Sequence, residues 1–210
     1  MGHGKQSTAI PSFRSLRLLK LGFLSQVEGE SVLIALPQPQ NKSLSDSTDP
    51  ALALQGIGWL TRKAVGLATI TLVVKQYEGP PSPPAEASAP PATHIEIDQI
   101  ATGGLKGTSE KRCLDSTFRE HSDWMFGTVK GRSAWVTPAE VEDAFLLKGW
   151  EPGSAEHVLS YVESIGNGWT ATQIWGFQVV DGERRYCRNI VVAKGSERVE
   201  MRLVYDYLAE

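Results

Sequence analysis

The chain has 210 residues and a net charge of −3. This length suits one large or two small domains with a buried core. The slightly acidic balance argues against a nucleic-acid-binding protein, because such proteins carry a basic excess. No apolar run approaches the roughly 20 residues of a membrane span. The two cysteines, Cys113 and Cys187, are too few for a disulfide framework.

Residues 1 to about 30 show no hydrophobic period. Val32 to Leu36 could form a first strand, which Pro37 and Pro39 break or confine to a sheet edge. We expect residues 1–40 to be a poorly ordered or loosely attached segment ahead of a barrel domain at 41–210. Basic residues scattered through the first 23 positions argue against a secretory signal. We expect a cytoplasmic protein. Arg14, Arg17 and Lys20 leave a mitochondrial presequence open as the alternative.

The stretch 49–77 predicts a helical pair followed by a strand. Asp49 and Pro50 are typical of a helix start. Apolar residues then follow at helical spacing, at Ile57, Leu60, Ala64 and Leu67. Gly56 and Gly58 divide this pattern into two short helices, and the β-branched run from Thr69 to Tyr77 predicts a strand.

A proline-rich segment separates this strand from the next. Residues 78–92 hold six of the twelve prolines and predict a solvated, extended loop. A ligand for proline-binding modules is the alternative reading of this loop. Residues 93–100 alternate strictly, with Ile95 and Ile97 on one face, and predict a half-buried strand.

Residues 137–150 predict a short helix inserted between strands. Thr137 and Glu140 have the spacing of a capping box, and Pro138 occupies the first helical position. Gly149 can end the helix.

The C-terminal third predicts an antiparallel meander of four strands. Two-residue turn signals lie between its alternating runs, at Asn167-Gly168, Asp181-Gly182 and Lys194-Gly195. With the earlier strands the count is eight to ten. We therefore predict a mainly β fold, an antiparallel up-and-down barrel with a helical lid, because closing the sheet removes its edges.

The stretch 56–76 resembles the second helix and following strand of the cytosolic fatty-acid-binding and retinoid-binding proteins. Their Gly-x-Gly-aromatic-x-Thr-Arg-Lys stretch is matched by Gly56, Gly58, Trp59, Thr61, Arg62 and Lys63. The whole chain also resembles a group of uncharacterised fungal lipocalin-like proteins. This likeness to the calycins implies a barrel that holds a small apolar ligand, entered beneath a lid that carries the portal residues Trp59, Arg62 and Lys63.

The family also places an Arg-x-Tyr pair on its last strand to hold a carboxylate. Here the spacing is Arg202 to Tyr205. Strand alternation would put these two side chains on opposite faces unless a bulge intervenes.

The expected ligand-binding residues are the large and polar side chains of the barrel interior. They are Trp135, Trp169, Gln173, Trp175, Phe177, Tyr186, Arg188 and Tyr205. An arginine inside an apolar cavity favours an anionic head group or an enolate-like oxygen. The alternative for Arg188 is a surface pair with Glu163 or Glu200.

The densest cluster of titratable groups lies in the segment from Arg119 to Trp124, with Arg119, Glu120, His121 and Asp123. A histidine beside a carboxylate can transfer protons. In a strand, however, neighbours point to opposite faces, and at a turn they are simply solvated. The histidines lack the spacing of metal ligands, so we expect no metal site and no cofactor.

The first functional hypothesis is a lipocalin-like binding protein for a small hydrophobic or amphipathic molecule or lipid. The second is a cofactor-independent isomerase or cyclase that folds a substrate in the same cavity, because some fungal pericyclases are lipocalin-like. The third is a packed barrel that interacts through its proline loop. We expect a monomer that does not bind nucleic acid and whose lid can contact membrane surfaces transiently.

Overall fold

The computed structural model describes residues 32–34, 37–86 and 88–207. The predictions for residues 1–31, including the targeting signals, lie outside this part of the chain. Val32–Ile34 and Gln38–Pro39 pair with a later strand, so the described sheet begins ahead of the expected domain boundary at residue 41.

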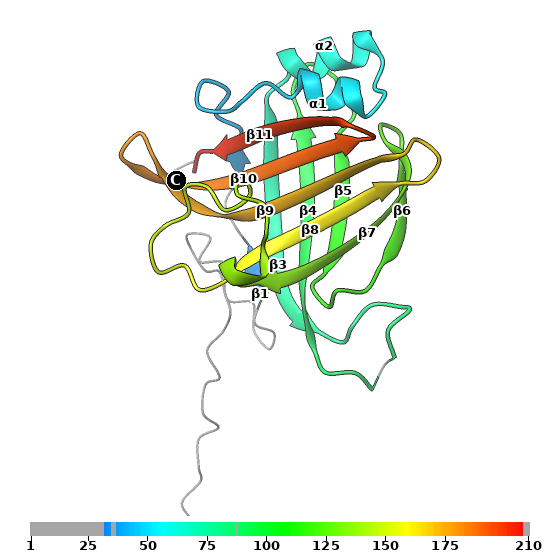
Figure 1. Cartoon of the computed structure of the whole chain (residues 1–210), viewed down its shortest axis with the longest axis vertical. Helices are drawn as coiled ribbons and strands as arrows, with labels where there is room; N and C mark the ends of the chain where they lie inside the picture. The colour runs from blue at the N-terminus through cyan, green and yellow to red at the C-terminus, as the bar shows by residue number, and fades with distance from the viewer. Residues whose placement is uncertain (1–31, 35–36, 87, 208–210) are drawn as a thin grey trace, which may run out of the picture.

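The described chain is mainly β and forms two antiparallel sheets of five and six strands (Figure 1). The first sheet contains β1 (Val32–Ile34), β2 (Gln38–Pro39), β3 (Ile70–Gly79), β4 (Ala92–Ala101) and β5 (Thr108–Cys113). The second contains β6 (Arg119–Asp123), β7 (Gly127–Val136), β8 (His157–Ser164), β9 (Trp169–Val180), β10 (Glu183–Lys194) and β11 (Glu197–Tyr205).

The two sheets meet closely at one pair of edges. Gln40 forms an isolated bridge with Tyr205, and the Asn41 amide donates to the Val204 carbonyl at 2.8 Å. At the opposite edges, β5 and β6 share no ladder in the described structure. The hydrogen-bonded ladders therefore do not close into the single ring that we expected.

The C-terminal meander is confirmed, with β8 to β11 pairing in chain order. Asp181 and Gly182 both have positive φ, 57° and 77°, as a tight two-residue hairpin requires. Tyr205 is buried between the sheets, whereas the Arg202 guanidinium contacts Gln178 beside the outer loop. The expected placement of Arg202 and Tyr205 on opposite faces is thus confirmed.

The helical pair is also confirmed, as α1 (Asp49–Leu54) and α2 (Trp59–Leu67). The two helices lie together at one end of the sheets (Figure 1). Ala51 and Leu54 of α1 pack against Trp169 and Met201. In contrast, α2 buries no residue, and Leu67 is 85 % exposed.

The predicted helix over 137–150 is wrong. Only a 3-10 turn forms, at Pro138–Glu140, although the capping box of Thr137 and Glu140 is present. After it, the Asp143 carboxylate accepts hydrogen bonds from the Phe145 and Leu146 amides. An aspartate that binds nearby backbone amides competes with helix formation, so the segment continues as turns.

This segment covers the outer face of the six-stranded sheet. Leu146 packs against Ile174 and Val191. The buried Asn189 side chain donates to the carbonyl oxygens of Phe145, Leu146 and Lys148. The other face of this sheet is left free to line the space between the sheets.

Candidate functional site

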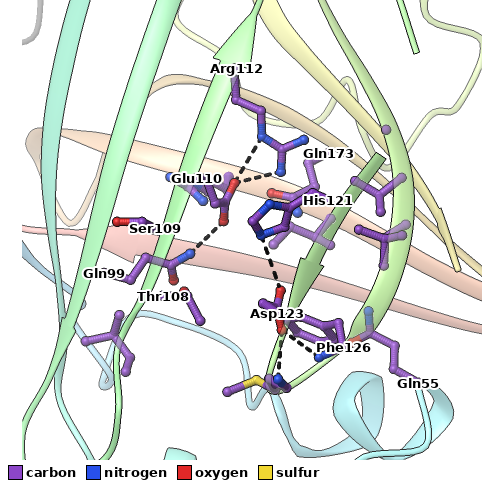
Figure 2. Close-up of a pocket in the computed structure, with 18 of the residues that line it drawn as sticks. Gln55, Gln99, Thr108, Ser109, Glu110, Arg112, His121, Asp123, Phe126 and Gln173 are labelled. Atoms are coloured by element: carbon purple, nitrogen blue, oxygen red, sulfur yellow. Dashed lines mark hydrogen bonds and ion pairs between the residues drawn. The ribbon is translucent and has the colours of Figure 1, made fainter. Parts of the chain in front are cut away.

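A cavity of about 640 Å³ lies between the two sheets. Leu52 of α1 and Gln55, the C-cap residue of that helix, line one part of it. The remaining lining comes mainly from β5, β6, β7, β9, β10 and β11. Figure 2 shows the part where β5 and β6 face each other across the cavity.

One wall of the cavity is apolar. It follows from alternation along the last three strands, which sends every second side chain inward. The residues concerned are Trp169, Ala171, Ile190, Val192, Met201 and Leu203. Phe126 packs edge-on against Trp169, with ring centroids 5.9 Å apart. This wall suits an apolar molecule of drug-like size.

The β5 side carries a charged network. Arg112 binds the Glu110 carboxylate through Nε at 3.1 Å and Nη2 at 2.6 Å, and Gln99 donates to the same carboxylate at 2.6 Å. Burial raises the pKa of Glu110, but Arg112 and Arg188 lower it more, so the net pKa is lowered. Glu110 is therefore an anion whose oxygens are already occupied.

The β6 side carries His121 and Asp123. His121 Nε2 lies 3.8 Å from Asp123 Oδ2. Asp123 also accepts hydrogen bonds from the Met125 and Phe126 amides, both at 2.7 Å, which fixes its carboxylate at the turn into β7. Figure 2 shows His121 reaching toward Glu110 and Arg112 from the opposite strand. His121 and Asp123 share a face because they are two residues apart, whereas the alternation argument concerned the adjacent pair Glu120 and His121.

Arg188 is the cation of the cavity interior. The residue is only 4 % exposed, and its guanidinium carbon lies 4.3 Å from the Trp175 ring centroid. Two tyrosine rings lie farther away, at 5.7 Å for Tyr186 and 5.6 Å for Tyr205. Burial lowers the pKa of Arg188, but Tyr186, Tyr205 and Glu110 raise it more, so the group stays charged. The alternative surface pairing with Glu163 or Glu200 is wrong.

Tyr205 is the third aromatic residue next to Arg188. Burial raises its pKa to about 12, partly opposed by Arg188. The phenol is therefore protonated at neutral pH and can act as a hydrogen-bond donor.

The structure brings together four of the eight expected ligand-binding residues at the cavity wall. These are Trp169, Gln173, Arg188 and Tyr205. The other four pack in or against the core beside the cavity rather than lining it: Trp135, Trp175, Phe177 and Tyr186.

The expected portal residues lie outside the cavity lining. Trp59 is exposed, and Arg62 is held by Asp49 through a 3.0 Å ion pair. Lys63 is likewise absent from the lining, to which α2 contributes only Val65. The lining instead includes all of β5 and most of β6.

Glu110 and Arg112 were missed by sequence reasoning. Their strand reads as polar alternation, which is typical of a solvated surface. The one available signal was the pair of opposite charges two residues apart, which share a face of a strand.

Two further observations concern the described residues as a set. No three histidine, cysteine, aspartate or glutamate side chains group so as to hold a metal ion there. Neither described helix has the length and apolar character needed to cross a membrane.

Both cysteines are buried and free.

Comparison with known proteins identifies the family. No protein-family model matches the chain. It is 34 % identical over 170 residues to scpY, a probable pericyclase of Mollisia scopiformis, covering 80 % of this chain and 86 % of that protein. It is 32 % identical over 170 residues to pydY, a pericyclase of an Acremonium species, covering 80 % and 88 %.

A solved structure of As-p18, an extracellular fatty acid binding protein, aligns with 82 % of this chain and 94 % of that one. The identity is 12 % and the TM-score is 0.35, so the two structures are too different for a conclusion about this chain. The sequence identities define the class: the chain belongs to a family of fungal pericyclases. The expected resemblance to fungal proteins therefore holds, and the relatives found are named as enzymes.

Proposed function

We propose that this protein is a cofactor-independent pericyclase that folds a flexible, apolar, unsaturated substrate in the cavity between its two sheets. The observation that carries the proposal is a cavity of about 640 Å³, lined by an apolar wall and a few fixed polar groups, in a chain of this family. The two sheets would act together as a barrel-like container.

A pericyclic reaction makes and breaks its bonds in one cyclic transition state. The protein's main contribution is then to hold the reacting carbons of one molecule close together in the reactive conformer. Trp169 and Met201 offer rigid and adaptable apolar contacts for this purpose. The polar groups on β5, β6 and β10 can stabilise charge that shifts as bonds form.

Binding without turnover is the competing function, since the same cavity would suit a carrier of small hydrophobic molecules. A direct assay separates the two. The substrate surrogate is 1,7,9-decatrien-3-one, a linear trienone that undergoes intramolecular cycloaddition slowly on its own. Product amounts and isomer ratios are followed by chromatography, and binding is followed by tryptophan quenching.

The decisive variant is Ala171→Trp, because Ala171 is a buried residue that lines the cavity. We expect the wild type to accelerate cyclisation and bias the isomer ratio, and A171W to lose at least about tenfold of the acceleration, as misplacement of reacting groups does. The control is Val179→Trp at the exposed end of the same strand. Binding with equal cyclisation in wild type, A171W and buffer would establish a carrier.

A further inference from the structure

Arg188 is a buried cation with unused hydrogen-bond donors. A guanidinium offers five N–H groups. Within the described structure Arg188 forms one hydrogen bond, from Nε to the Tyr186 hydroxyl at 3.3 Å, and its Nη2 has no partner. The residue lines the cavity. Most of its donor capacity is therefore not satisfied by the protein.

The nearby carboxylate does not satisfy it. Two N–H groups of Arg112 donate to one Glu110 oxygen, and the other Glu110 oxygen accepts from Gln99. No carboxylate of the described residues lies within ion-pair distance of Arg188. The Glu110 carboxylate is thus paired with Arg112 and does not form an ion pair with Arg188.

A buried guanidinium with unused donors lowers the stability of the protein when no ligand is bound. Burying a charge without a hydrogen-bonded partner is strongly unfavourable. The rings of Trp175, Tyr186 and Tyr205 offset part of this cost through cation–π attraction, which is directed at ring faces and leaves the N–H edge free. The free edge is complementary to an oxygen acceptor supplied by a ligand.

A second donor lies close by in the sheet. Gln173 lines the cavity, and its carbonyl oxygen accepts a 2.8 Å hydrogen bond from Trp175 Nε1, whose ring lies under Arg188. This bond fixes the orientation of the side-chain amide, because an indole N–H can only donate. The amide nitrogen of Gln173 is therefore the group left to donate toward the cavity.

Building on the pericyclase function, we propose that Arg188 binds the oxygen of a neutral carbonyl conjugated to the reacting alkene. The substrate class is thus an apolar polyene chain with an electron-poor, unsaturated ketone or amide. The carbonyl oxygen gains negative charge as the conjugated alkene accepts electron density in the transition state. A fixed, desolvated cation stabilises that state more than the ground state and so accelerates the reaction.

The proposal distinguishes a carbonyl from a carboxylate, and three matched probes can separate them. They are 2-dimethylaminonaphthalene, its 6-propionyl derivative Prodan, and 6-dimethylamino-2-naphthoic acid. The first has no oxygen, the second a conjugated ketone, and the third a carboxylate. Prodan emission also moves to longer wavelength when its carbonyl accepts a hydrogen bond.

The variants are Arg188→Met and Arg188→Lys. Arg188→Met removes the charge at similar side-chain length, and Arg188→Lys keeps the charge but loses the planar pair of guanidinium N–H donors. The control is Arg184→Met, on the same strand but paired with Glu151 at the surface. Circular dichroism checks that each variant is folded. Arg188→Lys provides the test should Arg188→Met fail to fold.

We expect R188M to weaken Prodan binding by about tenfold or more and to shift its emission to shorter wavelength, as loss of a charged hydrogen bond implies. R188K should fall between wild type and R188M. The oxygen-free probe, 2-dimethylaminonaphthalene, should bind all the proteins with equal affinity. R184M should bind Prodan with the same affinity and emission as the wild type.

Three other outcomes would contradict different parts of the argument. Unchanged Prodan affinity and emission in R188M and R188K would overturn the proposal for Arg188 while leaving the cavity function intact. Tight, Arg188-dependent binding of the naphthoic acid alone would also overturn it, in favour of a carboxylate site. Binding of none of the probes to the wild type would count against the proposed cavity function itself.

Discussion

Gly176 on β9 lies directly against the ring of His157 on the neighbouring strand. A Cβ atom at position 176 would be 2.6 Å from His157 Nδ1 and 3.3 Å from the Trp150 ring. The first distance is shorter than real Cβ contacts and the second is tighter than most of them, so a residue with a Cβ would have to displace the His157 ring. The close approach lets Trp150 and His157 pack together, with ring centroids 4.8 Å apart.

We expect Gly176→Ala to lower the free energy of unfolding by about 1–3 kcal/mol, because overpacking forces side chains and backbone apart. Urea denaturation measures the change. In a His157→Ala background the same substitution should cost much less, as a double-mutant cycle would reveal.

Gly66→Ala is the control for this prediction. Gly66 lies within α2 with open space around its Cα, and alanine there should leave stability equal or slightly higher. An equal cost for G176A with and without His157 would contradict the steric explanation.

At the scale of elements, the segment 141–150 is held to the sheet by one buried side chain. Asn189 is 1 % exposed and donates to three carbonyl oxygens of this segment, the shortest bond being 2.8 Å to Lys148. Gln178 donates to the same Lys148 carbonyl and to Asn189 Oδ1. Several backbone carbonyl groups of this segment, which bridges to a strand at Trp150, are thus satisfied by side chains of the sheet.

We expect Asn189→Leu to destabilise the protein by about 2–3 kcal/mol, because it removes the buried hydrogen bonds that Asn189 donates to this segment and the oxygen that accepts from Gln178. Hydrogen exchange should accelerate at the Leu147 and Lys148 amides. Gln173→Leu, on the opposite face of the same sheet, serves as the control and should leave exchange in this segment unchanged. Slow exchange in N189L would mean that apolar packing of Leu146 holds the segment by itself.

Local sequence signals predicted some elements well and others poorly. The hairpin at Asp181-Gly182 and the inward face that contains Trp169 and Gln173 follow from turn chemistry and period-two alternation, which act over a few residues. The capping box at Thr137 was real, yet no α-helix followed, because Asp143 and Asn189 bind the backbone instead. Asn189 is more than forty residues away in the chain, so no local pattern could reveal it.

The candidate site shows the same limit. Arg188 and Tyr205 could be placed inside by alternation, but the contribution of Glu110 and Arg112 depends on a second sheet lying opposite. Polar alternation on a strand predicts solvent on one face. It does not distinguish solvent from a cavity, and that distinction arises only when two sheets face each other.

At the scale of the whole molecule, the two sheets are joined where the chain end of β11 meets β2. Asp206 accepts a 2.9 Å hydrogen bond from Asn41, forms an ion pair with Arg185, and donates its amide to the Pro39 carbonyl. This carboxylate links both sheets at the edge opposite β5 and β6.

We expect Asp206→Ala to lower the free energy of unfolding by about 1–2 kcal/mol, because it removes charged hydrogen bonds that are partly buried. Hydrogen exchange should increase at Gln40 and Asn41, and probe affinity for the cavity should fall as the sheets separate. Glu183→Ala is the matched control, since Glu183 also pairs with Arg185 but is largely exposed, and it should cost less than about 1 kcal/mol. Equal effects of the two variants would contradict a joining role for Asp206.

The edges of β5 and β6 also have a consequence for solubility. Among the described residues each of these strands pairs with one neighbour, so each presents unpaired N–H and C=O groups that could recruit a strand from another molecule. Both edges carry a high density of charged side chains, including Glu110, Lys111, Arg112, Arg119 and Glu120. Charges at a strand edge discourage such pairing. Replacing charged residues at these two edges with apolar ones, in order to admit other substrates, would therefore promote self-association of the protein.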